Sequence, residues 1–396
     1  MKPGLKISSF FLAMAIAITA FAGCTPISLN KEWAYKTSDN ELAIGVYIYS
    51  LDTAYQRAKT YAENLDDYDD QSDSWLNMEI TDDDGNKEVA SKWIKDQAQL
   101  MCLSYLVVDE QLKKEGVEVD KNTLASADET AEEYWNVGMY ADYGYVMPMS
   151  DDLKPYGISQ ESFAYCSTEY TTKYQALFDA LYKEGGSKEV TNSQLSDYFT
   201  ENYVDYSYFT VNLYTSETDD SGQQTNKAMS DEDAKKVKDQ IDGYADDINN
   251  GKSYEDVVND YMKADDISTD PTQSATENLD DSTLGDEVKE ALEKLDSNKA
   301  TTVQVGDGDS AVYYLVYKKD INNTAKTYFD TDTNRDSVLT AMKQDEFDKY
   351  IEDLTKELDY EANTSQLDRY KPGMFFVKPE ETTAAASSDT ESSGTE

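Results

Sequence analysis

The residues that could carry out chemistry in this chain are few. It contains no histidine, and its three cysteines are Cys24, Cys102 and Cys166. Without histidine it has no Ser-His or Cys-His pair for nucleophilic catalysis, and zinc sites lose one of their commonest ligands. Cys102 and Cys166 lie in apolar segments, where a free thiol packs as a small hydrophobic group. A disulfide between them is the alternative outside the cytoplasm, and we favour two buried thiols.

Two clusters of carboxylates contain the oxygen ligands that calcium prefers. Asp82-Asp83-Asp84-Gly85 is the first, which we interpret as a tight, solvated turn. The second runs from Asp330 to Asp336 and imitates the start of an EF-hand loop. However, Arg335 stands at the position of the required glycine and Ala341 at that of the closing glutamate. We therefore predict no metal site and no cofactor, and interpret Asp332 or Asn334 as a helix N-cap.

Residues 1–23 have the pattern of a lipoprotein signal peptide. Lys2 and Lys6 form a positively charged n-region, and an apolar stretch too short for a stable membrane span follows. Ala22-Gly23-Cys24 then matches a lipobox, although Phe21 stands where leucine is usual. An ordinary secretory signal that contains a cysteine is the alternative. We predict an extracytoplasmic protein attached to the cell membrane by lipid on Cys24, with a tether over 24–40.

The net charge of the chain limits the classes of molecule that it can bind. Lys and Arg total 35 against 80 for Asp and Glu, giving a formal net charge of −45. Such a chain repels phosphate backbones, so nucleic acid is excluded as a partner. We interpret the charge mainly as a source of solubility. With 396 residues, the chain is long enough for about two or three domains.

The position of the first long helices follows from hydrophobic spacing. Between Lys87 and Leu112, apolar side chains recur at steps of three and four residues, which predicts an amphipathic helix. Gly116 suits the left-handed C′ position that ends it. A second helix is predicted over 41–65. The predicted buried face of the Lys87 helix consists of Val89, Trp93, Ile94, Leu100, Met101, Tyr105, Val108 and Leu112.

Three local motifs resemble a known family. The Lys87 helix followed by Gly-Val-x-Val-Asp at 116–120 resembles the N-terminal segment of extracytoplasmic foldases of the PrsA and SurA type, chaperones that carry parvulin-like peptidyl-prolyl isomerase domains. Tyr156-Gly-Ile-Ser, with Ser159 as N-cap, resembles the turn that opens the last helix of that region. The capping box of Thr191 and Gln194 resembles the start of a parvulin domain. The resemblance implies a helical chaperone module over 41–188.

The order of the following elements is similar to that of parvulins. We predict a strand over 206–214, a polar loop over 215–229, a helix that begins at Ser230, two further helices, and a closing strand over 311–317. This implies a parvulin-like α/β domain over 189–322. In the same family a C-terminal helix packs on the N-terminal helices, so we expect that role for 323–376. The tail 377–396 is too rich in Thr, Ser, Ala and Glu to fold.

The catalytic residues of parvulins are not matched. Active members have one histidine on the first strand and one on the last, around an apolar proline pocket. Here Asn212 stands at the first position and Tyr313 or Tyr314 at the last. Rotation about the amide faces a barrier of about 20 kcal/mol, and we expect little catalysis without those histidines. Whether the chain is an enzyme is left open.

Two sets of aromatic residues are candidates for peptide binding. In the parvulin-like domain we expect Tyr206, Tyr208, Phe209, Asn212 and Tyr313 to line a groove, with simple packing of the sheet as the alternative. Between Tyr140 and Met149 the chain is rich in tyrosine and methionine, whose side chains adapt to varied apolar peptides. There we expect Tyr143, Tyr145 and Met147 to contact clients, with core packing as the alternative.

Together these patterns predict an α+β protein with a mainly helical N-terminal chaperone-like module, completed by a C-terminal helix, and a central parvulin-like α/β domain. We predict a membrane-anchored foldase or chaperone that binds unfolded exported polypeptides. One alternative is a solute- or glycan-binding lipoprotein whose tyrosines stack on sugars. Another is an active isomerase with a histidine-free site. Homodimer formation is left open.

Overall fold

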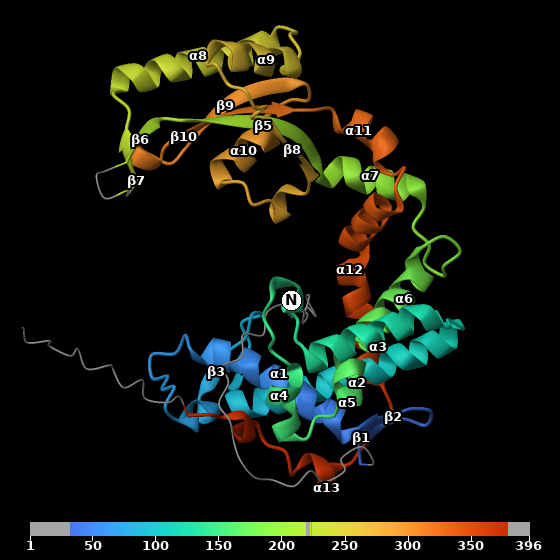
Figure 1. The fold of residues 1–396 in the computed structure, drawn as a ribbon. Coiled ribbons are helices and arrows are strands. Elements are labelled where there is room, and N and C mark those ends of the chain that lie inside the picture. Colours follow the sequence, from blue (N-terminus) through green and yellow to red (C-terminus); the bar gives the residue numbers. More distant parts are fainter. Residues whose placement is uncertain (1–31, 219–221, 223, 379–396) are drawn as a thin grey trace, which may run out of the picture. The chain divides into compact units, whose positions relative to one another are not determined.

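The computed structural model describes residues 32–218, 222 and 224–378. The predicted signal peptide, Cys24, the part of the tether before Glu32 and the tail from residue 379 lie outside this part. Contacts divide the described chain into two compact units, unit 1 (residues 32–189 and 343–378) and unit 2 (residues 190–342) (Figure 1). Helices and small antiparallel sheets occur together, so the fold class is α+β, as predicted. No described helix is both long and apolar enough to cross a membrane.

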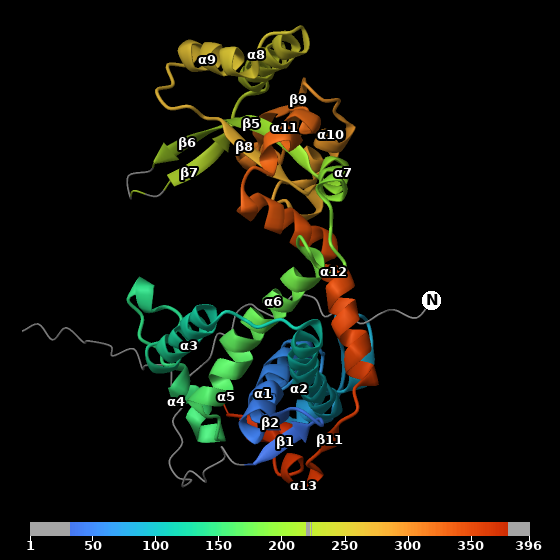
Figure 2. The same ribbon diagram turned by 90° about the vertical axis from the view of Figure 1, so that its right-hand side faces the viewer.

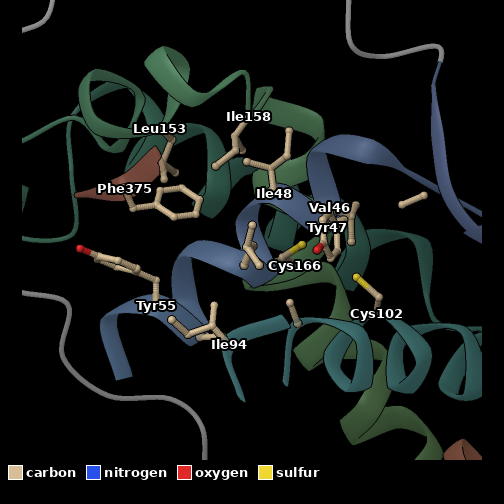
Figure 3. Close-up of a cluster of buried hydrophobic side chains, with 14 of the residues drawn as sticks. Val46, Tyr47, Ile48, Tyr55, Ile94, Cys102, Leu153, Ile158, Cys166 and Phe375 are labelled. Carbon is tan, nitrogen blue, oxygen red and sulfur yellow. The ribbon is translucent and has the colours of Figure 1, made fainter. Parts of the chain in front are cut away.

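Unit 1 is built around two long helices, α1 (Ile44–Ala62) and α2 (Ala90–Glu115). Both helices are confirmed, but each begins later than expected because short strands precede them, β2 (Glu41–Ala43) and β4 (Lys87–Val89). Val89, predicted on the buried face, is therefore exposed. Gly116 ends α2 in the left-handed conformation (φ 68°), as predicted. Figure 3 shows α1 and α2 side chains interlocking in the core.

The remaining helices of this region are α3 (Lys121–Asn136), α4 (Met149–Leu153), α5 (Gln160–Ala164) and α6 (Tyr170–Tyr182). Helix α6 lies between α3 and α2 (Figure 2). The predicted cap of α5 is confirmed, because Ser159 Oγ accepts a hydrogen bond from the Ser162 N–H at 3.2 Å. A π-helical turn over Tyr165–Glu169 joins α5 to α6, so the chain remains helical from Gln160 to Tyr182.

The part of the predicted tether that the structure describes is a strand. β1 (Trp33–Lys36) lies between β2 and β11 (Glu361–Ala362) in an antiparallel sheet of order β11-β1-β2. Ala34 and Tyr35 are buried, with the Tyr35 ring 6.1 Å from that of Tyr47. The tether prediction is wrong for these residues, because they pair with the neighbouring strand β2 on one side and with β11 from the far end of the chain on the other.

Two smaller elements complete unit 1 besides its long helices. β3 (Glu79–Thr81) and β4 form a hairpin, and Asp82 Oδ1 accepts hydrogen bonds from the N–H groups of Asp84 and Asn86 at 3.1 and 2.8 Å. The predicted tight turn at 82–85 is confirmed.

After α13 (Thr364–Leu367), Phe375 is buried between the rings of Tyr55 and Tyr156. The final described segment thus closes the core beside α1.

Helix α12 (Asp332–Glu357) contributes to both units. Its cap is Thr331, whose Oγ1 accepts from the Asn334 N–H at 3.3 Å, and not Asp332 or Asn334 as predicted. From Lys343 onward it packs within unit 1, where Phe347 contacts rings of α6. The division between the units therefore falls inside this helix, after Met342, whereas we expected it at residue 322.

Unit 2 begins with α7 (Asn192–Asn202), whose predicted capping box of Thr191 and Gln194 is confirmed. Its antiparallel sheet has the order β8 (Gln273–Glu277), β5 (Val204–Asn212), β10 (Val312–Lys318), β9 (Lys299–Val305). Helices α8 (Asp231–Asn249) and α9 (Tyr254–Ala264) cover one face and α10 (Asp286–Lys294) the other (Figure 1). α11 (Ile321–Tyr328) follows β10.

Strands of unit 2 were the least accurately predicted elements. The polar loop expected over 215–229 is instead a hairpin of β6 (Tyr214–Thr218) and β7 (Gln224–Ala228), whose residues are almost all exposed. Strands β8 and β9 were not predicted. Each is an edge strand: β8 pairs with β5, which lies far away in the sequence, and β9 pairs with β10, the next strand of the chain. Their polar composition carries no strong alternation, so pairing determines their structure.

Candidate functional site

Strands β5 and β10 carry most of the residues predicted to line a groove in unit 2. In their antiparallel register, Tyr208 lies opposite Val316 and Val211 lies opposite Tyr313. Successive side chains of a strand point to opposite faces of the sheet. The even-numbered residues of both strands therefore face α10, and the odd-numbered ones face α8 and α9, which agrees with the composition of the two cores.

The five residues predicted to line one groove are divided between these faces. Phe209 and Tyr313 are buried on the α8/α9 face, where Phe209 stacks on Tyr261 with 4.6 Å between ring centroids. The Tyr313 hydroxyl donates to Asp242 Oδ1 at 2.7 Å. Asn212 is exposed at the end of β5 and belongs to the other face. The single-groove prediction is wrong, and Asn212 and Tyr313 cannot replace two histidines around one pocket.

On the α10 face, Tyr206, Tyr208 and Tyr314 form a row, which we call the tyrosine row. Ring centroids are 6.1 Å apart for Tyr206 and Tyr208 and 5.6 Å apart for Tyr208 and Tyr314. The hydroxyl of Tyr206 donates to Glu277 Oε1 at 2.5 Å, and that of Tyr208 donates to Gln273 Oε1 at 2.6 Å. Tyr206 is buried, whereas Tyr208 and Tyr314 are half-buried and present ring surface to solvent.

The tyrosine row can stack on a peptide and hydrogen-bond to it, but its phenols are poor proton carriers near neutral pH. Burial raises the pKa of both Tyr206 and Tyr208 above the ordinary tyrosine range. The sequence left Tyr313 and Tyr314 as alternatives for the last family position; Tyr314 lies on the α10 face with Tyr208, and Tyr313 lies on the opposite face. Gln273 and Glu277 were not predicted as site residues, because they lie on the unpredicted strand β8.

The second predicted set lies in unit 1, in the loop between α3 and α4. Tyr143, Val146 and Tyr145 are 80%, 71% and 64% exposed. Core packing, the alternative interpretation, is therefore wrong for this loop, whereas Met149 at the start of α4 is buried. The sequence did not single out Met139 and Val146, although both are apolar neighbours of the predicted residues. We define the apolar loop by its exposed apolar side chains: Met139, Tyr140, Tyr143, Tyr145, Val146 and Met147.

Backbone contacts hold the apolar loop in shape. The N–H of Met147 donates to the Val137 carbonyl at 2.8 Å, and the N–H of Tyr145 donates to the Tyr140 carbonyl at 3.2 Å. Gly138 has φ 106°, and a Cβ atom there would lie 2.2 Å from the Met147 carbonyl oxygen. The two ends of the loop are thus pinned together. These backbone contacts fix the loop conformation, so the loop does not depend on packing of its exposed side chains.

Gly138→Ala is expected to open this loop. The new Cβ must displace the Met147 carbonyl, and the left-handed conformation alone costs a residue with a Cβ about 1–2 kcal/mol. Hydrogen exchange of the Met147 and Tyr145 amides should become faster. Gly144→Ala is the matched control, since φ is also positive there (82°) but no atom lies within 4 Å of the added Cβ. Equal exchange in the two variants would contradict this account of the loop.

Buried thiols and metal ligands offer no further site in the described ranges. Cys102 and Cys166 are free and buried, which confirms the favoured interpretation (Figure 3). Burial raises the pKa of the Cys102 thiol to about 12 and that of Cys166 well above its usual range. Both are therefore protonated and unreactive at neutral pH. Among residues 32–218, 222 and 224–378, no three His, Cys, Asp or Glu side chains are grouped so as to hold a metal ion.

No protein-family model matches the chain, and no curated protein matches it. Solved structures of foldases are similar to parts of it. The foldase protein PrsA from Streptococcus pneumoniae is 14% identical, over 76% of this chain and 99% of that one, with a TM-score of 0.33. PrsA from Bacillus subtilis is 13% identical, over 71% of this chain and 93% of that one, with a TM-score of 0.25.

Proposed function

We propose that this protein is an extracytoplasmic chaperone or foldase that binds unfolded exported polypeptides and is attached to the membrane through lipid on Cys24. The observation that carries the proposal is the apolar loop of unit 1. Its six exposed apolar side chains lie on one ordered loop of a chain whose net charge is −45. Contiguous apolar surface on a soluble domain marks an interaction site, because leaving it in water is unfavourable.

The chemistry of the loop suits a varied set of partners. Tyrosine provides a large apolar ring with a polar tip and only two rotatable side-chain bonds, while methionine adapts its shape to irregular surfaces. Such a surface binds apolar side chains of extended polypeptides without demanding one sequence. Because backbone hydrogen bonds already fix the shape of the loop, little conformational entropy is lost when a client binds.

Unit 2 supplies a second contact surface in this proposal. We assign it the role of a parvulin-like domain with weak or lost isomerase activity. Support comes from its four-stranded antiparallel sheet with helices on both faces and from the half-buried rings of Tyr208 and Tyr314. The chain has no histidine to occupy the positions that active parvulins use. The tyrosine row would bind peptide without lowering the rotation barrier appreciably.

The triple variant Tyr143→Ser, Tyr145→Ser, Met147→Ser is expected to lose most chaperone activity. Each of the three side chains is exposed, so the fold should remain intact, while the apolar contact area for a client is removed. We expect that about tenfold more protein is needed to suppress aggregation of an unfolded client, equivalent to about 1.4 kcal/mol of binding. The assay uses the chain from Thr25 onward and follows light scattering.

Val89→Ser is the control for this experiment, because Val89 is an exposed apolar residue of unit 1 outside the loop. It should leave suppression unchanged. A proline-peptide isomerisation assay on the same protein measures the second part of the proposal. Full suppression by the triple variant would contradict the role of the apolar loop, and isomerisation abolished by Tyr314→Phe would show an active, histidine-free enzyme instead.

A further inference from the structure

The apolar loop lies within a stretch of unit 1 whose charged side chains are all acidic. No lysine or arginine occurs between Lys121 and Lys154, and the acidic residues there are Asp128, Glu129, Glu132, Glu133, Asp142, Asp151 and Asp152. Glu132 and Glu133 are on the last two turns of α3, Asp142 lies within the loop, and Asp151 is in α4 directly after it. Carboxylates therefore border the apolar side chains before, within and after the loop.

These carboxylates are available to a partner. Glu132, Glu133, Asp142 and Asp151 are exposed, and within the described ranges none of them forms an ion pair. Lys154, the nearest basic residue along the chain, has its ammonium 5.4 Å from the Trp135 ring centroid and so is directed to an aromatic ring. The local negative field is thus unbalanced, and it favours a partner that carries positive charge.

The rings of the loop add a second preference for cations. A lysine or arginine over the face of a tyrosine ring is attracted by its π electrons. Unit 1 contains such a cation–π contact, in which the Lys173 ammonium lies 4.7 Å from the Tyr165 ring centroid. Tyr143 and Tyr145 are the most exposed tyrosines of the loop and have no such partner within the described chain. Their faces remain open to a cation from another chain.

We propose that the apolar loop and its flanking carboxylates select extended polypeptide segments in which apolar or aromatic side chains stand next to lysine or arginine, and reject segments flanked by acidic residues. This inference rests on the proposed chaperone function and specifies its clients. The apolar side chains supply contact area, while the carboxylates attract basic flanks and repel acidic ones. Charge selectivity of this kind weakens with salt, whereas apolar contact does not.

The test uses three fluorescent peptides with the same Leu-Tyr-Phe-Leu core and flanks of lysine, serine or glutamate, and measures binding to the chain from Thr25 onward by anisotropy. The lysine-flanked peptide should bind about tenfold more tightly than the glutamate-flanked one at low salt. The ratio should shrink towards one at about 300 mM salt, as the Debye length falls. The Tyr143, Tyr145, Met147 triple serine variant should weaken binding of all three.

A matched pair of charge variants locates the selectivity. Glu132→Gln, Glu133→Gln, Asp142→Asn should reduce the preference at least threefold. Asp66→Asn, Asp67→Asn, Asp70→Asn removes the same charge from exposed residues elsewhere in unit 1 and should leave it unchanged. Equal effects of the two variants would overturn the proposal in favour of the overall charge of the chain.

Other outcomes distinguish a failure of the charge preference from a failure of the proposed chaperone function. If all three peptides bound with equal affinity and the triple serine variant weakened each of them, the charge preference would be overturned but the chaperone function would still be supported. Loop-independent binding, or none, would overturn both. If the loop bound phosphatidylcholine vesicles but no peptide, its partner would be a lipid surface. If it mediated self-association in sedimentation but bound no peptide, its partner would be a second copy of the chain. Either result would overturn the proposal.

Discussion

Phe347→Ala is expected to lower the free energy of unfolding of unit 1 by about 3–5 kcal/mol, the usual range for truncating a buried phenylalanine. The side chain of Phe347 is fully buried. Its ring centroid lies 4.6 Å from that of Tyr174 and 5.4 Å from that of Phe178, both on α6. Truncation would leave a cavity between α12 and α6. Chemical denaturation followed by circular dichroism measures the loss.

The control is Lys349→Ala, two residues further along α12. Lys349 is exposed and pairs with Asp353 on its own helix, an interaction worth about 0.3–0.5 kcal/mol. If Phe347→Ala destabilised the protein no more than Lys349→Ala, the second half of α12 would not be part of the unit 1 core. Phe347→Leu, which retains most of the apolar volume, should fall between the two.

Asp52→Asn is expected to stabilise the protein by about 3 kcal/mol above pH 7. When folding raises the pKa of an aspartate by about two pH units, the charged carboxylate destabilises the folded state by about 3 kcal/mol. Asp52 is on the buried side of α1 and is only 4% exposed. Burial raises its pKa to about 6, and Asp152 adds to the shift, whereas the hydrogen bond that Gln56 Nε2 donates at 3.1 Å opposes it. Asparagine keeps an acceptor for Gln56 and carries no charge.

The sign of the pH dependence follows from linkage. Below about pH 4 the carboxyl is protonated in both states and its burial carries no charge penalty. Between about pH 4 and 6 the folded state keeps a proton that the unfolded state has released, so stability falls as pH rises. Above about pH 6 the full penalty remains. The gain from Asp52→Asn should therefore be large at pH 7.5 and nearly absent at pH 4.

Denaturant midpoints at the two pH values, for the wild type and for Asp52→Asn, measure this difference. Asp66→Asn is the matched control, since it makes the same substitution at an exposed residue in the loop after α1. A gain from Asp52→Asn that was equal at both pH values would point to better packing of the amide and would contradict the account based on charge burial.

The elements that the sequence predicted well are those whose signals are local. Apolar steps of three and four residues located α1 and α2, and the caps Gly116, Ser159 and Thr191 are confirmed with their hydrogen bonds or backbone angles. A helix makes its backbone hydrogen bonds within its own segment, so spacing and end residues are sufficient to place it. The tyrosine and methionine candidates at 143, 145 and 147 were likewise visible in the residue types, but their exposure was not.

Long-range pairing decided the rest. β1 pairs with β2, the next strand, and on its other edge with β11 from the far end of the chain. β8 pairs with β5, from which α8 and α9 separate it in the sequence. The pleat of β5 and β10 places Tyr208 and Tyr314 on one face of the sheet and Phe209 and Tyr313 on the other, because successive side chains of a strand point to opposite faces.

Thus the sequence by itself determined the long helices and the residue types of the candidate sites, because each is encoded within a few neighbouring residues. Only the tertiary structure decided which of those residues share a surface. Tyr143, Tyr145 and Met147 face solvent because the backbone of Gly138 packs on that of Met147, whereas Phe209 and Tyr313 are covered by α8 and α9. Exposure depends on the neighbours that folding supplies, and these come from distant parts of the chain.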